Sequence, residues 1–131
     1  MSRIRRFAIL AIVVGAFTCR AENPSDIIIA RTAAQKNMRS SEGQAYYRQL
    51  REQFTEKYRR TKARCSTNRE VTELVNFDVY IRMKQNGTVD EVLLSPKTKV
   101  ASCIREKLVK DRFAPPPQPR YWVHLDMRAG K

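Results

Sequence analysis

The stretch RFAPPPQPRYWVHLDM, residues 112–127, decides the fold because it ends one element and begins another. Four of the six prolines of the chain lie within it. Proline lacks a backbone N–H and restricts the residue before it to extended geometry, so the run stops a helix and continues as a polyproline-like lead-in. Apolar and polar side chains then alternate, which predicts a strand over residues 121–127. Because prolines cannot donate ladder hydrogen bonds, we expect this strand at the edge of a sheet.

Two further predicted strands precede this stretch and form a hairpin. FDVYIRM, residues 77–83, alternates with the period of a half-buried strand, and VDEVLLS, residues 89–95, returns beside it. Asn86-Gly87 between them is the dipeptide most typical of a type I′ turn, in which both central residues take a positive φ. We therefore expect an antiparallel pair with a tight connection.

Helical periodicity fills the rest of the chain. NPSD at residues 23–26 predicts a helix start with proline in the first turn. SEGQ at residues 41–44 has the spacing of a capping box and predicts a new start after a break near residues 39–40. In the helix that follows, Arg and Lys side chains occupy the face opposite to the apolar stripe and are interpreted as its solvated side. A third helix is predicted from the apolar spacing within residues 100–108.

The order of these elements predicts an α+β fold of two layers, a small antiparallel three-stranded sheet with helices packed on one face. We expect three parts: a cleaved signal peptide over residues 1–21, an N-terminal helical segment over residues 22–64, and an α+β domain over residues 65–131.

The N-terminus has the pattern of a secretory signal. A basic start, MSRIRR, is followed by an uncharged run over residues 7–17 and by the small residue Ala21 at a suitable cleavage point. The apolar run is shorter than the roughly 17 to 25 residues of a membrane span, so we expect a cleaved signal. A retained membrane anchor is the alternative. The whole chain carries 26 Lys and Arg against 13 Asp and Glu, and cleavage after Ala21 would remove four arginines, leaving 22 − 13 = +9. We expect a basic periplasmic protein.

Cysteine content agrees with export. Cys19 would leave with the signal, and Cys65 and Cys103 remain as an even pair in an oxidising compartment. We predict a disulfide between them, with two buried thiols as the alternative. Zinc is not expected from two cysteines and the single His124.

Catalysis is not predicted. A general base, a nucleophile or a metal centre usually needs His, Cys or clustered carboxylates in a cleft. The one histidine lies on a predicted strand, where contact with a partner is the better interpretation. We therefore expect no enzyme activity, no cofactor and no nucleic-acid partner.

The alternating strand FDVYIRM, the turn NGTVDEV, the helix VASCIREKLVKDRF and the following prolines resemble, over residues 74–128, the C-terminal domain of TonB-type energy transducers and their periplasmic relatives. That family is not enzymatic, and its domain captures a short extended peptide as an added strand. The resemblance implies partner contacts at Tyr121, Trp122, His124 and Asp126. A long spacer is absent from this sequence, which places force transmission in doubt.

Three functions are compatible with these patterns. The first is a periplasmic binding or adaptor module that holds a protein or peptide partner of the cell envelope by β-strand addition. The second is a small inhibitor or immunity-type protein. The third is a basic module that binds anionic envelope polymers. An edge strand of this kind also favours a homodimer through the same edge.

Overall fold

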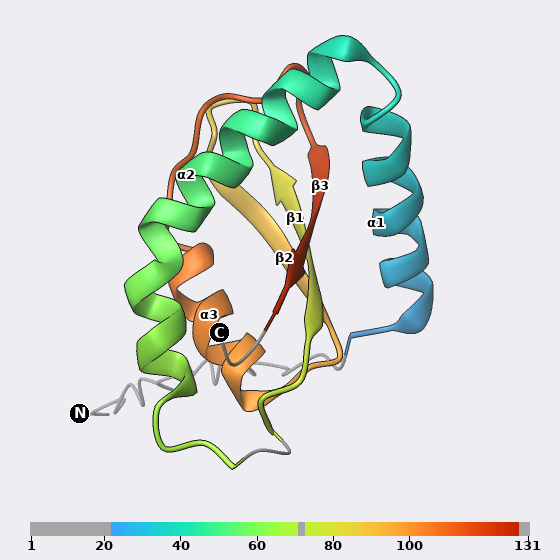
Figure 1. Cartoon of the computed structure of the whole chain (residues 1–131). Coiled ribbons are helices and arrows are strands. Elements are labelled where there is room, and N and C mark those ends of the chain that lie inside the picture. The colour runs from blue at the N-terminus through green and yellow to red at the C-terminus, as the bar shows by residue number, and fades with distance from the viewer. Residues whose placement is uncertain (1–21, 71–72, 129–131) are drawn as a thin grey trace, which may run out of the picture.

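The computed structural model describes residues 22–70 and 73–128, so the predicted signal peptide lies outside the described residues. The elements follow in the order α1 (Pro24–Asn37), α2 (Ser41–Ser66), β1 (Phe77–Met83), β2 (Val89–Ser95), α3 (Lys99–Leu108) and β3 (Tyr121–Met127) (Figure 1). The predicted α+β class with a small antiparallel sheet is confirmed.

The three strands form one sheet in the order β2-β1-β3. Both pairings are antiparallel: Val79 of β1 lies opposite Leu94 on β2 and opposite Leu125 on β3. The strand after the prolines is therefore an edge strand, as predicted.

The hairpin between β1 and β2 is confirmed, but the prediction of a type I′ turn is wrong. Asn86 does not take a positive φ, whereas Gly87 has a φ of 85°. Gly87 N–H donates to the Lys84 carbonyl, and Lys84 N–H donates to the Thr88 carbonyl, the pattern of a type I turn followed by a glycine in the left-handed region. The Asn86 side chain accepts from the N–H and the hydroxyl of Thr88, a local contact that stabilises the turn.

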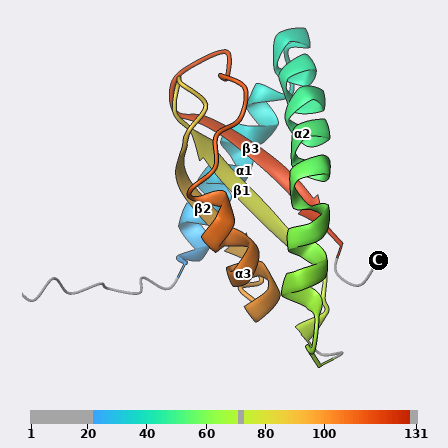
Figure 2. The ribbon, with the colours of Figure 1, turned by 90° about the vertical axis from the view of Figure 1, so that its left-hand side faces the viewer.

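The helices cover both faces of the sheet, which corrects the expectation of a single helical face. α2 and α3 lie together on one side, and α1 lies on the other (Figures 1 and 2). On the α1 side, Ala30 packs with Tyr80 and Leu93 in a small apolar cluster. Tyr80 is fully buried on this side of the sheet, and Arg31 of α1 donates to its hydroxyl at 3.0 Å. The small alanines of α1 let that helix approach this aromatic face closely.

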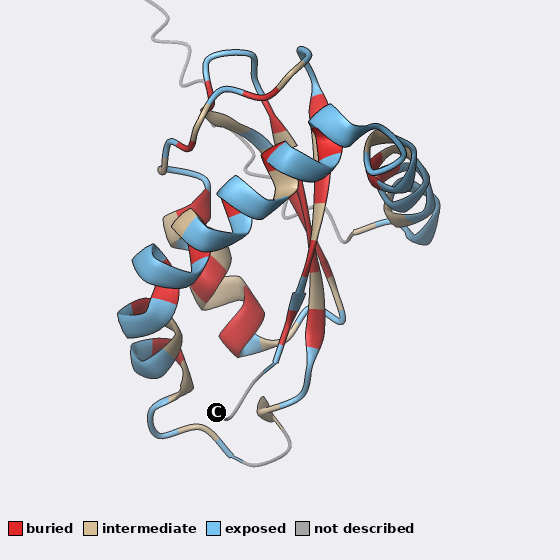
Figure 3. Cartoon of the chain, turned by 45° about the horizontal axis from the view of Figure 1, so that its top comes forward, coloured by how far each residue is buried: buried red, intermediate tan, exposed pale blue. Residues whose placement is uncertain are grey.

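The main core lies between the sheet and α2 with α3. Leu50, Phe54 and Tyr58 form the buried stripe of α2, while the opposite face of that helix is exposed (Figure 3). Cys65 at the end of α2 is bonded to Cys103 of α3, as predicted, with an S–S distance of 2.10 Å. Helices from the N-terminal segment thus share one core with the strands.

The proline segment crosses the end of the hairpin and leads into β3. Phe113 is buried, and its N–H donates to the Gly87 carbonyl at 2.9 Å. The Tyr46 hydroxyl donates to the Ala114 carbonyl at 2.9 Å, which ties the segment to α2. Arg120, the last residue before β3, has a φ of 54°, so the chain turns sharply into the edge strand.

Candidate functional site

The outward backbone groups of β3 are the first feature of the candidate site. In an antiparallel ladder, alternate residues of the central strand bond to opposite neighbours. The N–H of Lys84 bonds toward β2, so the backbone N–H and C=O groups of Arg82, Tyr80 and Asp78 also bond to β2. The backbone groups of the other residues of β1 bond to β3. Those remaining residues lie opposite Tyr121, Val123, Leu125 and Met127. The N–H and C=O groups of Trp122, His124 and Asp126 therefore point away from the sheet.

A side-chain contact agrees with this assignment and fills one of the outward positions. Asn37, the last residue of α1, donates from Nδ2 to the Trp122 carbonyl at 3.0 Å. Among the described residues, no group of another element bonds the outward backbone of His124 or Asp126. Within the part of the chain that the structure describes, the outward backbone groups of His124 and Asp126 are thus available to a further strand.

The opposite edge of the sheet is partly closed. The outward N–H of Leu94 on β2 donates to Oε2 of Glu22 at 2.8 Å, and Oε1 of the same carboxylate lies 2.5 Å from Nη1 of Arg105. Glu22 thus places a nearly buried carboxylate against the β2 edge, where an added strand would need that N–H. Among the described residues, each edge thus has one outward backbone group bonded by a side chain, and the β2 contact comes from a nearly buried carboxylate that also pairs with Arg105.

A groove of about 1010 Å³ runs along the α2 side of the β3 edge. Residues one or two helical turns apart on α2 form one wall, and the end of β3 forms the other. The lining residues are Tyr47, Arg51, Phe54, Thr55, Tyr58, Arg59, Lys62, Ala63 and Ser66 of α2, with Leu125, Asp126, Met127 and Arg128. Ser66 Oγ is buried in this wall without a hydrogen-bond partner among the described residues.

A smaller pocket of about 290 Å³ lies at the start of β3, between the end of α1 and the start of α2. Its walls are mostly apolar and aromatic and include Ala34, Tyr46, Tyr121 and Trp122. The small pocket thus borders the first half of β3, and the groove borders its end.

Three of the four predicted partner-contact residues are accessible on the α1 side. Trp122 is half-buried, with the Arg82 guanidinium 5.4 Å from its ring centre, and Asp126 is exposed. His124 stacks on Tyr80 at 4.7 Å between ring centres, and its Nε2 lies 2.7 Å from Asp78 Oδ1.

Tyr121 is the exception among the four. Its ring is buried and meets Tyr46 edge-on at 5.4 Å between ring centres. Burial, and then the nearby Glu42 carboxylate, raise the pKa of Tyr121. Its side chain forms a wall of the small pocket instead of an exposed contact.

The α2 wall of the groove was not predicted from the sequence, because its charged residues were expected on an ordinary solvated helix face. Arg51 and Arg59 lie two helical turns apart on the stripe that faces β3. The spacing of Arg51, Thr55 and Arg59 at steps of four was a visible signal. What the sequence could not supply was the position of an open strand edge below that stripe.

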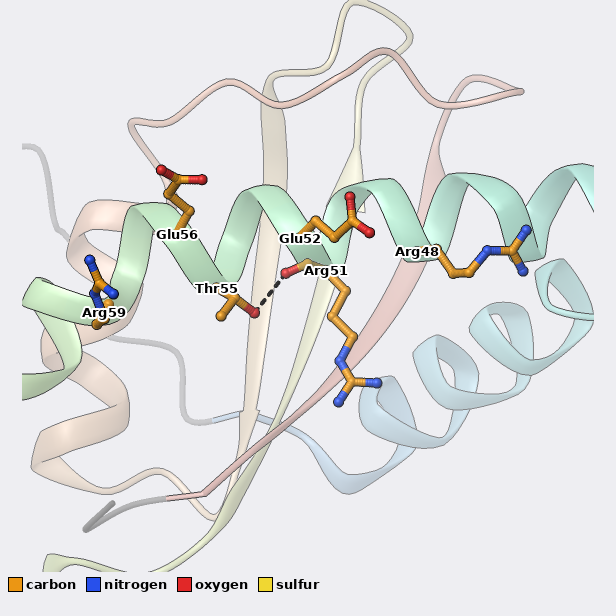
Figure 4. Close-up of a pocket in the computed structure, with 6 residues that line it drawn as sticks. All are labelled: Arg48, Arg51, Glu52, Thr55, Glu56 and Arg59. Carbon is orange, nitrogen blue, oxygen red and sulfur yellow. Dashed lines mark hydrogen bonds between the residues drawn. The ribbon is translucent and has the colours of Figure 1, made fainter.

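The outer surface of α2 offers a second, shallower hollow, lined by Arg48, Arg51, Glu52, Thr55, Glu56 and Arg59 (Figure 4). All six come from one helix, and the Thr55 hydroxyl is bonded to the Arg51 carbonyl of the same helix at 2.8 Å. Arginines and glutamates alternate here, as on a solvated helix face. This hollow lacks a second wall and is not a candidate site.

Within residues 22–70 and 73–128 no group of three or more His, Cys, Asp or Glu side chains is placed to hold a metal ion. No helix in the same residues is long and apolar enough to cross a membrane. Comparisons with known proteins give no match: no family model, no curated protein and no solved structure is significantly similar to the chain. The candidate site therefore has to be interpreted from its own geometry.

Proposed function

We propose that this chain is an exported binding or adaptor module that holds an extended segment of another protein as an added strand on β3. The observation that carries the proposal is the outward backbone of His124 and Asp126, which lies between the groove and the small pocket and has no hydrogen-bond partner among the described residues. Strand addition draws its affinity from main-chain hydrogen bonds, and flanking pockets for alternate side chains supply selectivity. The β3 edge has both components.

The sequence resemblance supports the same mode. TonB-type C-terminal domains add a peptide strand to their sheet, and the matching stretch of this chain ends in β3. The signal-like N-terminus and the Cys65–Cys103 bond support a periplasmic location, where a disulfide persists. N-terminal sequencing of the protein from a periplasmic fraction is expected to begin at Glu22, and recovery of the uncleaved chain from membranes would contradict soluble export.

A substitution at Asp126 tests backbone capture directly. Asp126→Pro removes an outward N–H without removing a bond to β1, and proline is tolerated at such edge positions. Asp126→Ala is the matched control, since it removes the side chain and keeps the N–H. We expect a crosslinking pull-down from the native envelope to lose its partner band with the proline variant and to keep it with the alanine variant.

Two results would contradict the proposal. The first is equal capture by the two folded variants, which would show that the outward N–H of Asp126 is not used. The second is a stable dimer of the wild-type chain that the proline variant converts to a monomer, which would assign the edge to a second copy of the chain. Circular dichroism and sedimentation of both variants supply these controls.

A further inference from the structure

We infer that the segment captured on β3 is acidic, with carboxylates on the side that faces α2. This inference rests on the proposed function and concerns the chemistry of its partner. Its basis is the charge of the α2 groove, whose wall on α2 carries Arg51 and Arg59.

Strand geometry determines which side chains of a captured segment meet this groove. Successive side chains of a strand point to opposite faces of the sheet, so every second residue of an added strand faces α2 and the others face α1. The α2-facing residues would lie below the stripe that contains Arg51, Thr55 and Arg59.

The positive charge of this wall is not neutralised within the described part of the chain. Both arginines are exposed, and neither of them forms an ion pair with a described carboxylate. Figure 4 shows the Glu52 and Glu56 carboxylates on the side of α2 away from the Arg51 guanidinium. Lys62 lines the same wall and already interacts with another group of the chain.

The single carboxylate among the groove residues does not alter this balance. Asp126 alternates with Leu125 and Met127, both of which are buried in the core on the α2 side, so its side chain lies on the α1 face. A captured strand thus has a basic surface on one side and the polar His124 and Asp126 side chains on the other. Carboxylates are favoured on the first side only.

Apolar surface adds a second requirement. The small pocket at the start of β3 is mostly apolar and is bordered by Ala34 of α1 and by Trp122, so α1-facing residues of a captured strand would meet apolar surface there. A segment made only of acidic residues would leave this surface uncovered. The occupant that fits is an extended segment in which acidic residues alternate with apolar ones.

Synthetic peptides of matched length test the inference. One alternates valine with glutamate, the second valine with glutamine, and the third valine with lysine; binding to the disulfide-bonded chain from Glu22 onward is followed by fluorescence anisotropy. Two exposed ion pairs near the upper end of their usual strength predict that the glutamate peptide binds about tenfold more tightly than the glutamine peptide at low salt. The preference is expected to shrink as salt rises.

Charge reversal on the groove wall supplies the matched variants. Arg51→Glu with Arg59→Glu is expected to abolish the preference for glutamate and to favour the lysine peptide. Arg60→Glu carries the same kind of change on an exposed position that helical geometry places on the opposite side of α2, and we expect it to keep the preference. Loss of preference in the Arg60→Glu variant would overturn the assignment to the groove.

The outcomes separate this inference from the proposed function. Equal binding of glutamate and glutamine peptides, both abolished by Asp126→Pro, would overturn the acidic preference and leave strand addition intact. Absence of binding by every peptide, together with a pull-down that is insensitive to Asp126→Pro, would overturn both. A tenfold preference for glutamate that the double reversal removes would support both.

Discussion

The Glu22 carboxylate accepts a hydrogen bond from the backbone N–H of Leu94 across a sequence separation of 72 residues. The same carboxylate meets Arg105 of α3, so one side chain joins the start of the described chain to a sheet edge and to a helix. On the other edge of the sheet the comparable contact, from Asn37 to Trp122, closes only the first outward position of β3. The two edges of one small sheet are thus closed by different side chains, and this difference is the reason that the proposed strand addition is assigned to β3.

Glu22→Ala is expected to lower the free energy of unfolding by about 2 kcal/mol, since hydrogen bonds to charged groups contribute about 1.5–3 kcal/mol each and Arg105 is left without its partner. Urea unfolding followed by circular dichroism measures the change. Glu22→Gln keeps the acceptor for Leu94 but loses the ion pair, so its cost should be smaller.

Glu56→Ala is the control for this prediction, because Glu56 is an exposed carboxylate on α2 with no ion pair among the described residues. We expect a change within about 0.5 kcal/mol. Equal losses in the Glu22 and Glu56 variants would show that Glu22 has no special role.

The Cys65–Cys103 bond closes a loop of 38 residues between α2 and α3. By the chain-entropy estimate, a loop of this size contributes about 3–4 kcal/mol, a large part of the stability of a small domain. The double variant Cys65→Ala with Cys103→Ala should therefore unfold at a much lower urea midpoint. Addition of a reductant should shift the wild-type midpoint toward that of the variant and leave the variant unchanged; a reductant-insensitive wild type would contradict the prediction.

The strands of this fold could be predicted from the sequence, and the placement of α1 could not. Alternation in residues 77–83 and 121–127 is a local property, and the prolines before the last strand are a strong signal for an edge. The face of the sheet that α1 covers depends on contacts far apart in the chain. Tyr80 and Trp122 on the nominally polar face, together with Ala30 of α1, were the available sign that this face also packs.

The candidate site, too, could be predicted from the sequence only in part. The open edge was predictable because it follows from one strand and its prolines. The basic groove was not, because a helical wheel separates a buried stripe from an exposed one but does not say which exposed residues border another element. Arg51 and Arg59 are candidates because α2 lies beside β3 in the folded chain, which places them at the border of the groove.

Two glycines should tolerate no side chain. A Cβ on Gly43 would lie 1.8 Å from the Asn37 carbonyl oxygen, where α1 and α2 meet. A Cβ on Gly87 would lie 2.0 Å from the Phe113 carbonyl oxygen, and the φ of 85° adds backbone strain. Since backbone must move in each case, Gly43→Ala and Gly87→Ala should each cost about 2 kcal/mol or more in urea unfolding.

Ser41→Ala is the control for Gly43→Ala, because it adds no atoms and changes an exposed residue in the same first turn of α2. We expect it to be nearly neutral. A neutral Gly43→Ala variant would show that the junction of α1 and α2 relaxes easily, and would weaken the placement of Asn37 against the β3 edge.

Alkaline titration tests the aromatic packing around α2. Burial raises the pKa of Tyr46 to about 12, and burial together with the hydrogen bond to Asp111 raises the pKa of Tyr58 further. In the unfolded chain both phenols ionise near pH 10, so above that pH the unfolded state loses protons that the folded state keeps. The contribution of the two tyrosines to the free energy of unfolding is thus fully present below about pH 10. It falls as the pH rises toward 12, by up to about 1.4 kcal/mol per pH unit for each tyrosine. Tyrosinate absorbance should show these two residues titrating late, and Tyr46→Phe should flatten the decline; the same slope in that variant would contradict the assignment.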